Sequence, residues 1–171
     1  MLTECAHSSI CHFEGVYETD NSTYVILELY PLSLYGYLQK FGFPAENSAK
    51  AMIVHLLEGV NYLHTRGIMH RDLKLENIMV KKNSSGQVVP VIVDLGLAEY
   101  TSATKYLYTR CGTPGYVAPE VLRIKSSDPV QTYSSSCDVF SIGVIYHILM
   151  FRKPVFEGKD VKEVIKKNCD C

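Results

Sequence analysis

The sequence has little net charge, no internal repeat and no apolar run long enough to cross a bilayer. Its formal net charge is −1 over 171 residues, so neither sign of charge favours a nucleic acid or a membrane surface as a partner. The most apolar run, residues 139–151, is too short for a membrane span and contains Ser141 and His147, so it predicts a buried helix. Residues 1–15 lack the apolar core of a secretory signal, so we expect no leader there. The length predicts a single domain.

Paired cysteines are also lacking. The six cysteines are scattered, and none belongs to a Cys-x-x-Cys pair. This pattern favours free thiols in a reducing compartment, so we expect a cytoplasmic protein. Four residues of zinc-ligand type cluster near the start of the chain in a spacing that matches no common zinc finger; these are Cys5, His7, Cys11 and His12. A zinc site there stays open as an alternative.

Hydrophobic periodicity predicts a mixture of helices and short strands. Residues 11–18 and 23–29 read as two strands around a turn cluster, which predicts a hairpin. One long helix is predicted by apolar residues three and four apart, namely Ala49, Met52, Ile53, Leu56, Leu57, Val60 and Leu63. His55 and His64 on this helix are expected at its surface or in packing. The other predicted elements are an amphipathic segment at 32–40, strands at 78–80 and 91–93, a buried helix at 134–150 and a short helix at 160–167.

The most informative stretch is residues 70–77, which read HRDLKLEN and place a carboxylate, an ammonium and an amide within one tight loop. Phosphoryl transfer needs an acceptor hydroxyl held in line, metal ions on the phosphates and positive charge near the leaving oxygens. Asp72 can receive the hydroxyl proton, and Lys74 can contact the transferred group. Asn77, together with Asp94 after the second apolar strand, supplies the oxygen ligands that Mg²⁺ prefers.

Three further motifs follow in order. A histidine, arginine and aspartate in succession usually mark only a solvated turn, but here they are followed by DLG at 94–96, GTPGYVAPE at 112–120 and DVFSIG at 138–143. Together the four motifs resemble the eukaryotic protein kinases. The form of residues 112–120, with Lys74 two residues after Asp72, resembles serine/threonine kinases, in the style of the calcium/calmodulin-dependent group.

The resemblance implies an α+β fold, a protein-kinase-like fold that is mainly the helical C-lobe with the last two N-lobe strands and the hinge. Residues 1–171 would be a partial kinase domain, with 1–27 a remnant of the N-lobe, 28–35 the hinge and 36–171 a C-lobe lacking its final helices. The family's Gly-rich loop and its Val-Ala-Ile-Lys-like strand have no counterpart in the sequence. The arginine that normally pairs with Glu120 is also missing, so we expect an unpaired, buried or half-buried carboxylate there.

Two cofactors, ATP and Mg²⁺, are implied by the resemblance. Leu27 falls on the gatekeeper position, and Glu28 and Tyr30 fall on the hinge whose backbone meets adenine. Met79 corresponds to the residue under the adenine ring, and Asp94 to a metal ligand. Leu95 replaces the commoner phenylalanine after that aspartate.

The resemblance also assigns roles around the acceptor. Asp72 would be the base, Lys74 and Thr113 would support transfer, and Asn77 would hold metal. Thr113 is expected to hydrogen-bond both Asp72 and Lys74. Glu76 would face the substrate and pair with a basic residue before the acceptor. A second acidic partner is replaced by Ile148, so only a modest basic preference is expected.

The remaining assignments are structural and regulatory. His70, Glu120 and Asp138 would be structural, with Asp138 bracing the backbone of the catalytic loop. Residues 97–111 are polar, rich in hydroxyls and without a usable period, which predicts a long functional loop. In the family this is the activation segment, where Thr109 would carry a phosphate that meets Arg71.

These observations predict an ATP-dependent serine/threonine protein kinase. It would transfer phosphoryl from Mg-ATP to a protein Ser/Thr hydroxyl, with its activation loop phosphorylated by an upstream activating kinase. No nucleic-acid or membrane partner is expected. The alternative is a non-catalytic kinase-like binding or regulatory fragment that lacks the Gly-rich loop and the ATP-binding lysine, and the 171-residue chain alone is expected to be inactive.

Overall fold

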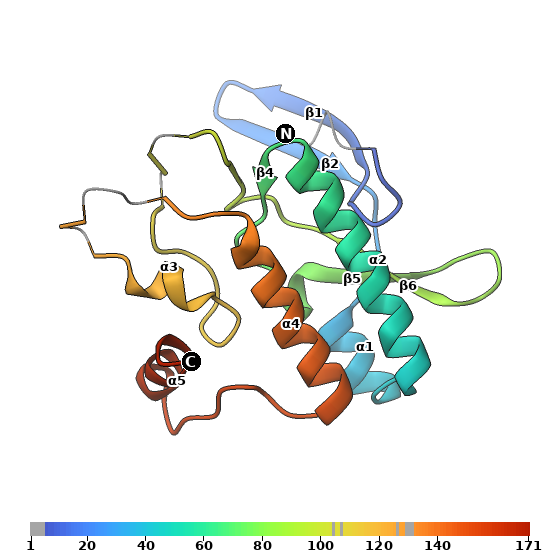
Figure 1. Ribbon diagram of the computed structural model, residues 1–171. Helices are drawn as coiled ribbons and strands as arrows, with labels where there is room; N and C mark the ends of the chain where they lie inside the picture. Colours follow the sequence, from blue (N-terminus) through green and yellow to red (C-terminus); the bar gives the residue numbers. More distant parts are fainter. Residues whose placement is uncertain (1–5, 104, 107, 126, 129–131) are drawn as a thin grey trace.

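Two long helices form the centre of the protein. In the computed structural model, which describes residues 6–103, 105–106, 108–125, 127–128 and 132–171, α2 (Glu46–Thr65) packs against α4 (Ser136–Phe151) (Figure 1). The stripe predicted on α2 is confirmed, because Ala49, Leu56 and Leu63 are fully buried there. Leu57, which was counted in the stripe, is instead 41% exposed because the buried face is narrower than the apolar run.

The helix α4 faces two apolar clusters and leaves one side to solvent, where Val139 is 49% exposed. Ile142, Ile145 and Leu149 face the core that α2 shares, whereas Cys137 joins a second apolar cluster with Tyr106 and Val117. A helix between two clusters needs apolar residues around most of its circumference, which explains the apolar run in the sequence.

Three small antiparallel sheets surround the helices. The strands β1 (Phe13–Thr19) and β2 (Ser22–Leu27) form the predicted hairpin. The second sheet has the order β3-β5-β6, from β3 (Leu32–Ser33), β5 (Ile78–Lys82) and β6 (Val88–Ile92). The third pairs β4 (Ile68–Met69) with β7 (Glu99–Tyr100).

The strands β5 and β6 are longer than predicted and include Pro90. Proline is tolerated here because β6 lies at the edge of its sheet. The backbone N–H of Ile92, two residues further on, donates to Ser9 O at 2.8 Å, away from β5. The nitrogen of Pro90 points to the same side, so no ladder hydrogen bond to β5 is lost.

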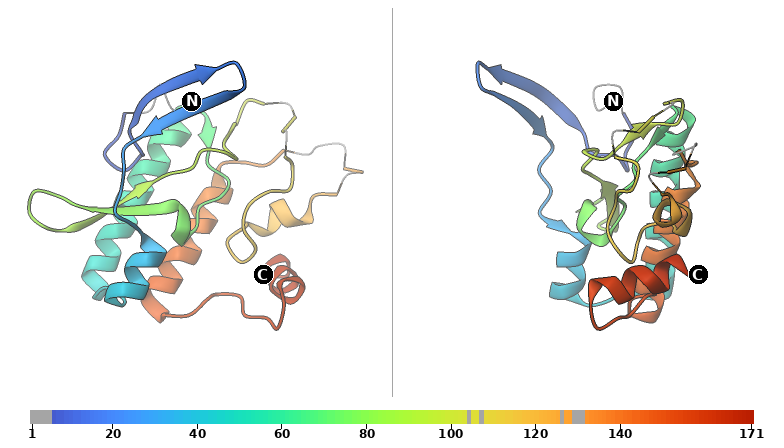
Figure 2. Two further views of the ribbon diagram at one scale, coloured as in Figure 1. Left: turned by 180° about the vertical axis from the view of Figure 1, so that it is seen from behind. Right: turned by 90° about the vertical axis from the view of Figure 1, so that its left-hand side faces the viewer.

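The hairpin extends away from the helices (Figure 2). Its apolar side chains are largely exposed, including Tyr17 at 64% and Ile26 at 52%. The residues before the hairpin contact the rest of the chain through a short parallel bridge, in which Cys11 N donates to Ile92 O at 2.8 Å, and through Ala6 N, which donates to Tyr62 Oη at 2.8 Å. The hairpin is therefore held by its own pairing more than by packing.

Three short helices complete the fold, and their ends follow the usual capping rules. The helix α1 (Leu34–Phe41) is capped by Ser33 Oγ, which accepts from Gly36 N at 3.1 Å. The helix α5 (Val161–Cys169) is capped by Asp160 and lies close to the predicted 160–167. The helix α3 (Pro119–Arg123) begins with proline at its first position.

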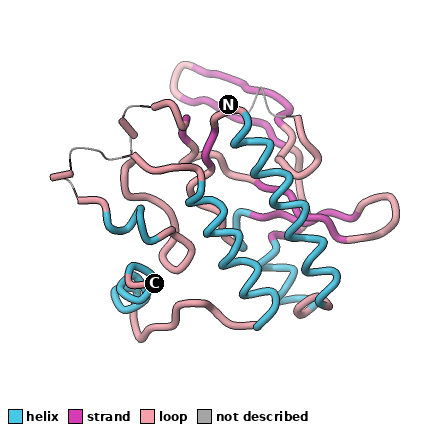
Figure 3. The backbone as a smooth tube through the Cα atoms, viewed as in Figure 1, coloured by secondary structure: helices cyan, strands magenta, loops and turns pink. Residues whose placement is uncertain are grey.

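Loops make up much of the chain between β6 and α4 (Figure 3). Within the loop predicted for residues 97–111, β7 pairs with β4, with Ile68 opposite Tyr100 and Met69 opposite Glu99. A strand of two residues is too short to show a period, which is why the sequence did not reveal it. No helix in the described part of the chain is long and apolar enough to cross a membrane.

Candidate active site

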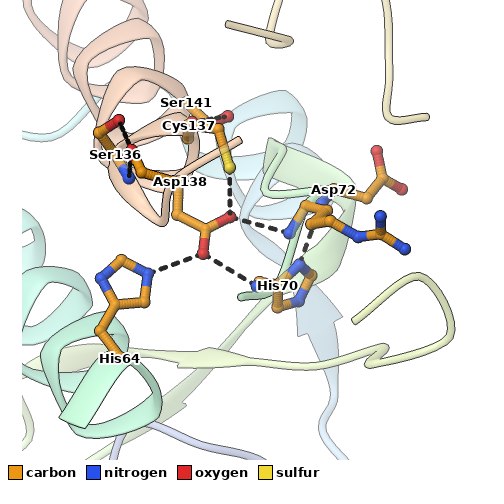
Figure 4. A network of polar contacts seen from close by, with 9 residues as sticks. His64, His70, Asp72, Ser136, Cys137, Asp138 and Ser141 are labelled. Atoms are coloured by element: carbon orange, nitrogen blue, oxygen red, sulfur yellow. Dashed lines mark hydrogen bonds and ion pairs between the residues drawn. The ribbon is translucent and has the colours of Figure 1, made fainter. Parts of the chain in front are cut away.

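Asp138 holds the loop of residues 70–77, which carries the candidate catalytic residues, through hydrogen bonds to its backbone. The side chain of Asp138 is 1% exposed near the start of α4. Its Oδ2 accepts from the backbone N–H of His70 at 2.9 Å, and its Oδ1 accepts from that of Arg71 at 2.8 Å (Figure 4). Arg71 has a φ of 69°, a left-handed conformation that is unfavourable for a residue with a Cβ. The two hydrogen bonds offset this cost and hold the loop in one conformation.

His64, near the end of α2, also contacts Asp138. Its Nε2 lies 2.8 Å from Asp138 Oδ2, and its side chain is 17% exposed. The sequence analysis assigned His64 only to the helix surface or to packing and missed this contact. The two residues are 74 positions apart, and no local pattern around His64 reveals the pairing.

His70 links the catalytic loop to the strand that delivers Asp94. It is fully buried, and its Nδ1 accepts from the backbone N–H of Asp72 at 3.2 Å. The proton of a neutral ring is therefore on Nε2, which donates to Val93 O at 2.9 Å. The backbone N–H of Val93 donates in turn to Asn77 O at 3.0 Å. Val93, the residue before Asp94, is therefore hydrogen-bonded to His70 at the start of the catalytic loop and to Asn77 at its end.

Four of the predicted residues meet in one cluster. Asp72 Oδ1 accepts from Thr113 Oγ1 at 2.7 Å, and Lys74 Nζ donates to Thr113 Oγ1 at 2.9 Å. Lys74 Nζ also lies 3.0 Å from Asp72 Oδ2, and Asn77 Nδ2 donates to the same oxygen at 3.0 Å. The expected hydrogen bonds of Thr113 are thus present. Each oxygen of Asp72 is oriented by a donor and retains lone pairs that can accept from an incoming hydroxyl.

Asn77 and Asp94 fit the requirements of a magnesium site. Both Nδ2 bonds of Asn77 go to Asp72, one to the backbone oxygen at 2.9 Å, so its Oδ1 is the atom left to bind a cation. Asp94 is exposed at the end of β6, with a φ of 63°. Its Oδ1 accepts from Gly96 N at 3.1 Å, and a Cβ on Gly96 would lie 2.9 Å from that oxygen. A side chain at position 96 would therefore displace this carboxylate oxygen.

The residues assigned to the nucleotide come from the end of β2, the segment that follows it and β5. Met79 packs against a small cluster that contains Cys11, Tyr30 and Val91. Leu27 contributes to a pocket of about 260 Å³ whose lining also includes Asp94. An apolar pocket that ends at a carboxylate suits a flat ring joined to a metal-bound phosphate chain.

Part of the expected hinge packs against the rest of the chain. Tyr30 is buried, and its hydroxyl donates to Glu28 Oε2 at 2.6 Å. This hydrogen bond, aided by nearby Lys81, lowers the pKa of the Glu28 carboxyl. Leu32 and Ser33 pair with β5, and α1 begins at Leu34, so the range 28–35 includes a strand and a helix start.

Arg71 is bound by the loop that follows Gly96. Its side chain is buried, with Nε donating to Leu97 O at 2.7 Å and Nη1 donating to Tyr108 O at 2.9 Å and to Tyr133 Oη at 3.2 Å. Tyr106 lies beneath the guanidinium, 5.1 Å from ring centroid to Cζ, and is 2% exposed. Thr109 is half-buried and directly follows a carbonyl that binds Arg71. Arg71 thus binds the residue that precedes Thr109.

Glu120 differs from the expectation. It lies in the first turn of α3 and is exposed, whereas the sequence analysis expected a buried or half-buried carboxylate. The short α3 buries Val121 and leaves the neighbouring position to solvent. An exposed carboxylate is hydrated and needs no arginine partner.

The residues considered for zinc do not assemble in the part of the chain that the structure describes. No group of three or more possible metal ligands is found among the described residues, and Cys5 lies outside them. His7 Nδ1 accepts from Ser9 N at 3.1 Å, and Cys11 is buried.

Comparison with known proteins identifies the family. The model of the protein kinase domain matches residues 1–171, so the chain belongs to the protein kinase family. It is 36% identical to "Probable serine/threonine-protein kinase 2" of Plasmodium falciparum (isolate K1 / Thailand), over 100% of this chain and 32% of that protein. It is 38% identical to "Serine/threonine-protein kinase 33" of Bos taurus, over 98% of this chain and 35% of that protein.

A further relative is "Calcium-dependent protein kinase 5" of Plasmodium falciparum (isolate 3D7), which is 34% identical over 98% of this chain and 28% of that protein. The chain spans about a third of the length of these relatives. The resemblance noted in the sequence, including its serine/threonine style, is confirmed by these matches.

Proposed function

We propose that this chain supplies the catalytic loop, metal ligands and acceptor site of an ATP-dependent serine/threonine protein kinase. The observation that carries the proposal is the cluster of Asp72, Lys74, Asn77 and Thr113, which four hydrogen bonds and ion pairs of 2.7–3.0 Å hold together. A carboxylate, an ammonium and a hydroxyl held this closely suit a reaction that transfers a phosphoryl group to an alcohol.

In this proposal Asp72 accepts the hydrogen of a Ser or Thr hydroxyl on a protein substrate and orients its oxygen for attack. Lys74 lies beside the carboxylate and stabilises negative charge on the transferred phosphoryl group. Thr113 holds both side chains in place. Asn77 Oδ1 and Asp94 would hold Mg²⁺, which neutralises charge on the phosphates of ATP when it is bound. The adenine would lie near Leu27, Glu28, Tyr30 and Met79.

We further propose that an upstream kinase phosphorylates Thr109 and that the phosphate acts through Arg71. The support is positional. Arg71 already binds the carbonyl of Tyr108, the residue before Thr109, at 2.9 Å. A phosphate adds roughly −1.5 to −2 charge and three strong acceptors, so it would compete for the same guanidinium.

The test uses the full-length protein, because this chain spans about a third of the length of the relatives it matches. We expect Asp72→Asn to lower kcat for peptide phosphorylation by about 10²- to 10⁴-fold while leaving the KM for ATP nearly unchanged. Asp20→Asn, an exposed carboxylate in the turn between β1 and β2, is the matched control and should leave kcat unaltered.

Unchanged turnover in Asp72→Asn would remove the proposed role of the cluster. If the wild-type full-length protein binds Mg-ATP but phosphorylates no substrate, the alternative of a non-catalytic kinase-like binding module would replace it.

A further inference from the structure

A pocket beside the acceptor cluster has charges of opposite sign at its two ends. Its volume is about 310 Å³, and its walls come from α1, the loop after α1, residues 75–76, Tyr116 and the chain around the end of α4. Leu38 is buried in one wall, and Ile148 is half-buried in another. The middle of the pocket is therefore apolar and suited to an apolar side chain.

The pocket shares two segments with the acceptor cluster. Leu75 follows Asp72 by three residues, which an extended chain spans in at most about 11 Å. Tyr116 N donates to Thr113 O at 3.0 Å, and Thr113 Oγ1 bonds to Asp72. A peptide whose hydroxyl lies at Asp72 therefore reaches the pocket within a few residues.

The inner end of the pocket is acidic. Glu76 is exposed there, four positions after Asp72 in the same loop. Burial, followed by the charge of Glu76, raises the pKa of the neighbouring Tyr116 phenol to about 12. Tyr116 is thus a neutral wall next to a carboxylate, and that carboxylate suits a basic side chain close to the acceptor.

The outer end is basic. Arg152 and Lys153 line it, and both are exposed. They follow the C-terminal end of α4, a helix of 16 residues that is about 24 Å long. Asp138 near the other end of α4 binds the catalytic loop, so the two cations lie further from the acceptor than Glu76 does. In the described part of the chain no ion pair is formed by either cation.

The turn that places these cations is unusual for the residue that makes it. Arg152 is the C-cap of α4 with φ 61° and ψ 25°, a left-handed conformation in which glycine is the favoured residue. Its backbone N–H donates to Ile148 O at 2.9 Å, which closes the helix. Glycine would adopt this conformation more easily than arginine, so replacing Arg152 by glycine removes the guanidinium without straining the turn.

We propose that this pocket selects protein substrates with an apolar residue upstream of the acceptor and an acidic residue further upstream. The acidic residue pairs with Arg152 and Lys153. Glu76 adds a modest preference for a basic residue on the acceptor side. The inference rests on the proposed function, because it assigns the substrate class of the same site. Ile148 gives the apolar contact, and the two cations give the charge contact.

The test is a positional peptide library with a fixed serine acceptor, phosphorylated by the full-length protein. We expect Asp or Glu at the outer position to raise kcat/KM over Gln by about two- to fivefold for each cation, as for exposed ion pairs, and to lose this advantage at high salt. The variant Arg152→Gly/Lys153→Gln should abolish the acidic preference and keep the apolar one. Its fold is expected to persist because glycine suits the left-handed turn.

Two controls separate the contributions. Lys162→Gln removes an exposed cation on α5, outside the pocket, and should leave the preference unchanged. Glu76→Gln should lower the basic preference at the inner position only. If peptides are phosphorylated but acidic residues are not favoured, or remain favoured in the double variant, the inference is wrong and the proposed function stands.

If no peptide is phosphorylated, the proposed function fails instead. Fluorescence anisotropy with a labelled peptide of the favoured pattern then decides the inference. Equal affinity for wild type and for Arg152→Gly/Lys153→Gln overturns it, and weaker binding to the double variant supports it.

Discussion

We expect the carboxylate of Asp138 to stabilise the conformation of the catalytic loop more than any other single side chain that contacts it. Its two oxygens accept from two consecutive backbone N–H groups, of His70 and Arg71, in a site where Asp138 is 1% exposed. In Asp138→Asn the amide nitrogen replaces one acceptor by a donor, and a donor cannot pair with a backbone N–H. At least one buried N–H is then left without a partner.

The magnitude follows from these contacts. A buried donor left unsatisfied costs roughly 1–3 kcal/mol, so Asp138→Asn should lower the free energy of unfolding by about that amount. Asp138→Ala orphans both donors and should cost about 2–6 kcal/mol by the same reasoning. His64→Ala removes a partner that is 17% exposed, and water can replace it, so we expect no more than about 1.5 kcal/mol.

Urea unfolding measures the three free energies, and amide hydrogen exchange reports the site directly. Exchange at His70 and Arg71 should accelerate in Asp138→Asn and stay slow in His64→Ala. Steady-state kinetics on the full-length protein should show a fall in kcat with little change in the KM for ATP, because the displaced loop carries Asp72. If the free energy of unfolding of Asp138→Asn lies within about 0.5 kcal/mol of the wild-type value, Asp138 does not brace the loop.

Two further predictions concern the loop after Gly96 and the thiols. Thr109→Ala should lower the activity of the phosphorylated full-length protein, and Arg71→Ala should abolish the difference between the phosphorylated and unphosphorylated forms; equal activity with and without phosphate on Thr109, measured on separated forms, would contradict this. Burial, reinforced by the charge of Asp138, raises the pKa of the Cys137 thiol. Cys137 therefore stays a neutral thiol at pH 8, and mass spectrometry should find iodoacetamide on exposed Cys171 long before Cys137, whereas equal labelling would mean that α4 opens readily.

The elements that the sequence predicted well are those in which a hydrophobic pattern repeats over many residues or a complete motif is present. The stripe runs from Ala49 to Leu63 in α2, a helix of 20 residues, and the apolar run of residues 139–151 lies in α4, a helix of 16, so packing in the core agrees with local pattern in both helices. The catalytic loop was found because the residue types that phosphoryl transfer needs are adjacent in the chain. Shorter elements escaped, as with β7, whose two residues are defined only by pairing with β4.

What the sequence could not predict were pairings between distant side chains and the exposure of single residues. The contact of His64 with Asp138 depends on how α2 and α4 cross, and Glu120 is exposed because α3 buries its neighbour instead. The charges at the pocket beside the acceptor belong to the same class of feature. Glu76 and Arg152 are 76 positions apart by their numbers, and only the folded chain brings them to one pocket.

Backbone strain is a further feature that the sequence did not predict. Three residues other than glycine have positive φ in the described chain, and they are Arg71, Asp94 and Arg152. Each costs roughly 1–2 kcal/mol in a conformation that glycine would adopt freely. Arg71 binds the loop after Gly96, Asp94 is the candidate metal ligand, and Arg152 lines the pocket beside the acceptor. Hydrogen bonds hold each of these conformations: Arg71 N donates to Asp138 Oδ1, Asp94 Oδ1 accepts from Gly96 N, and Arg152 N donates to Ile148 O. Because glycine adopts this conformation freely, Arg152→Gly removes the guanidinium without straining the turn, so a change in substrate choice in that variant reports the side chain and not the backbone.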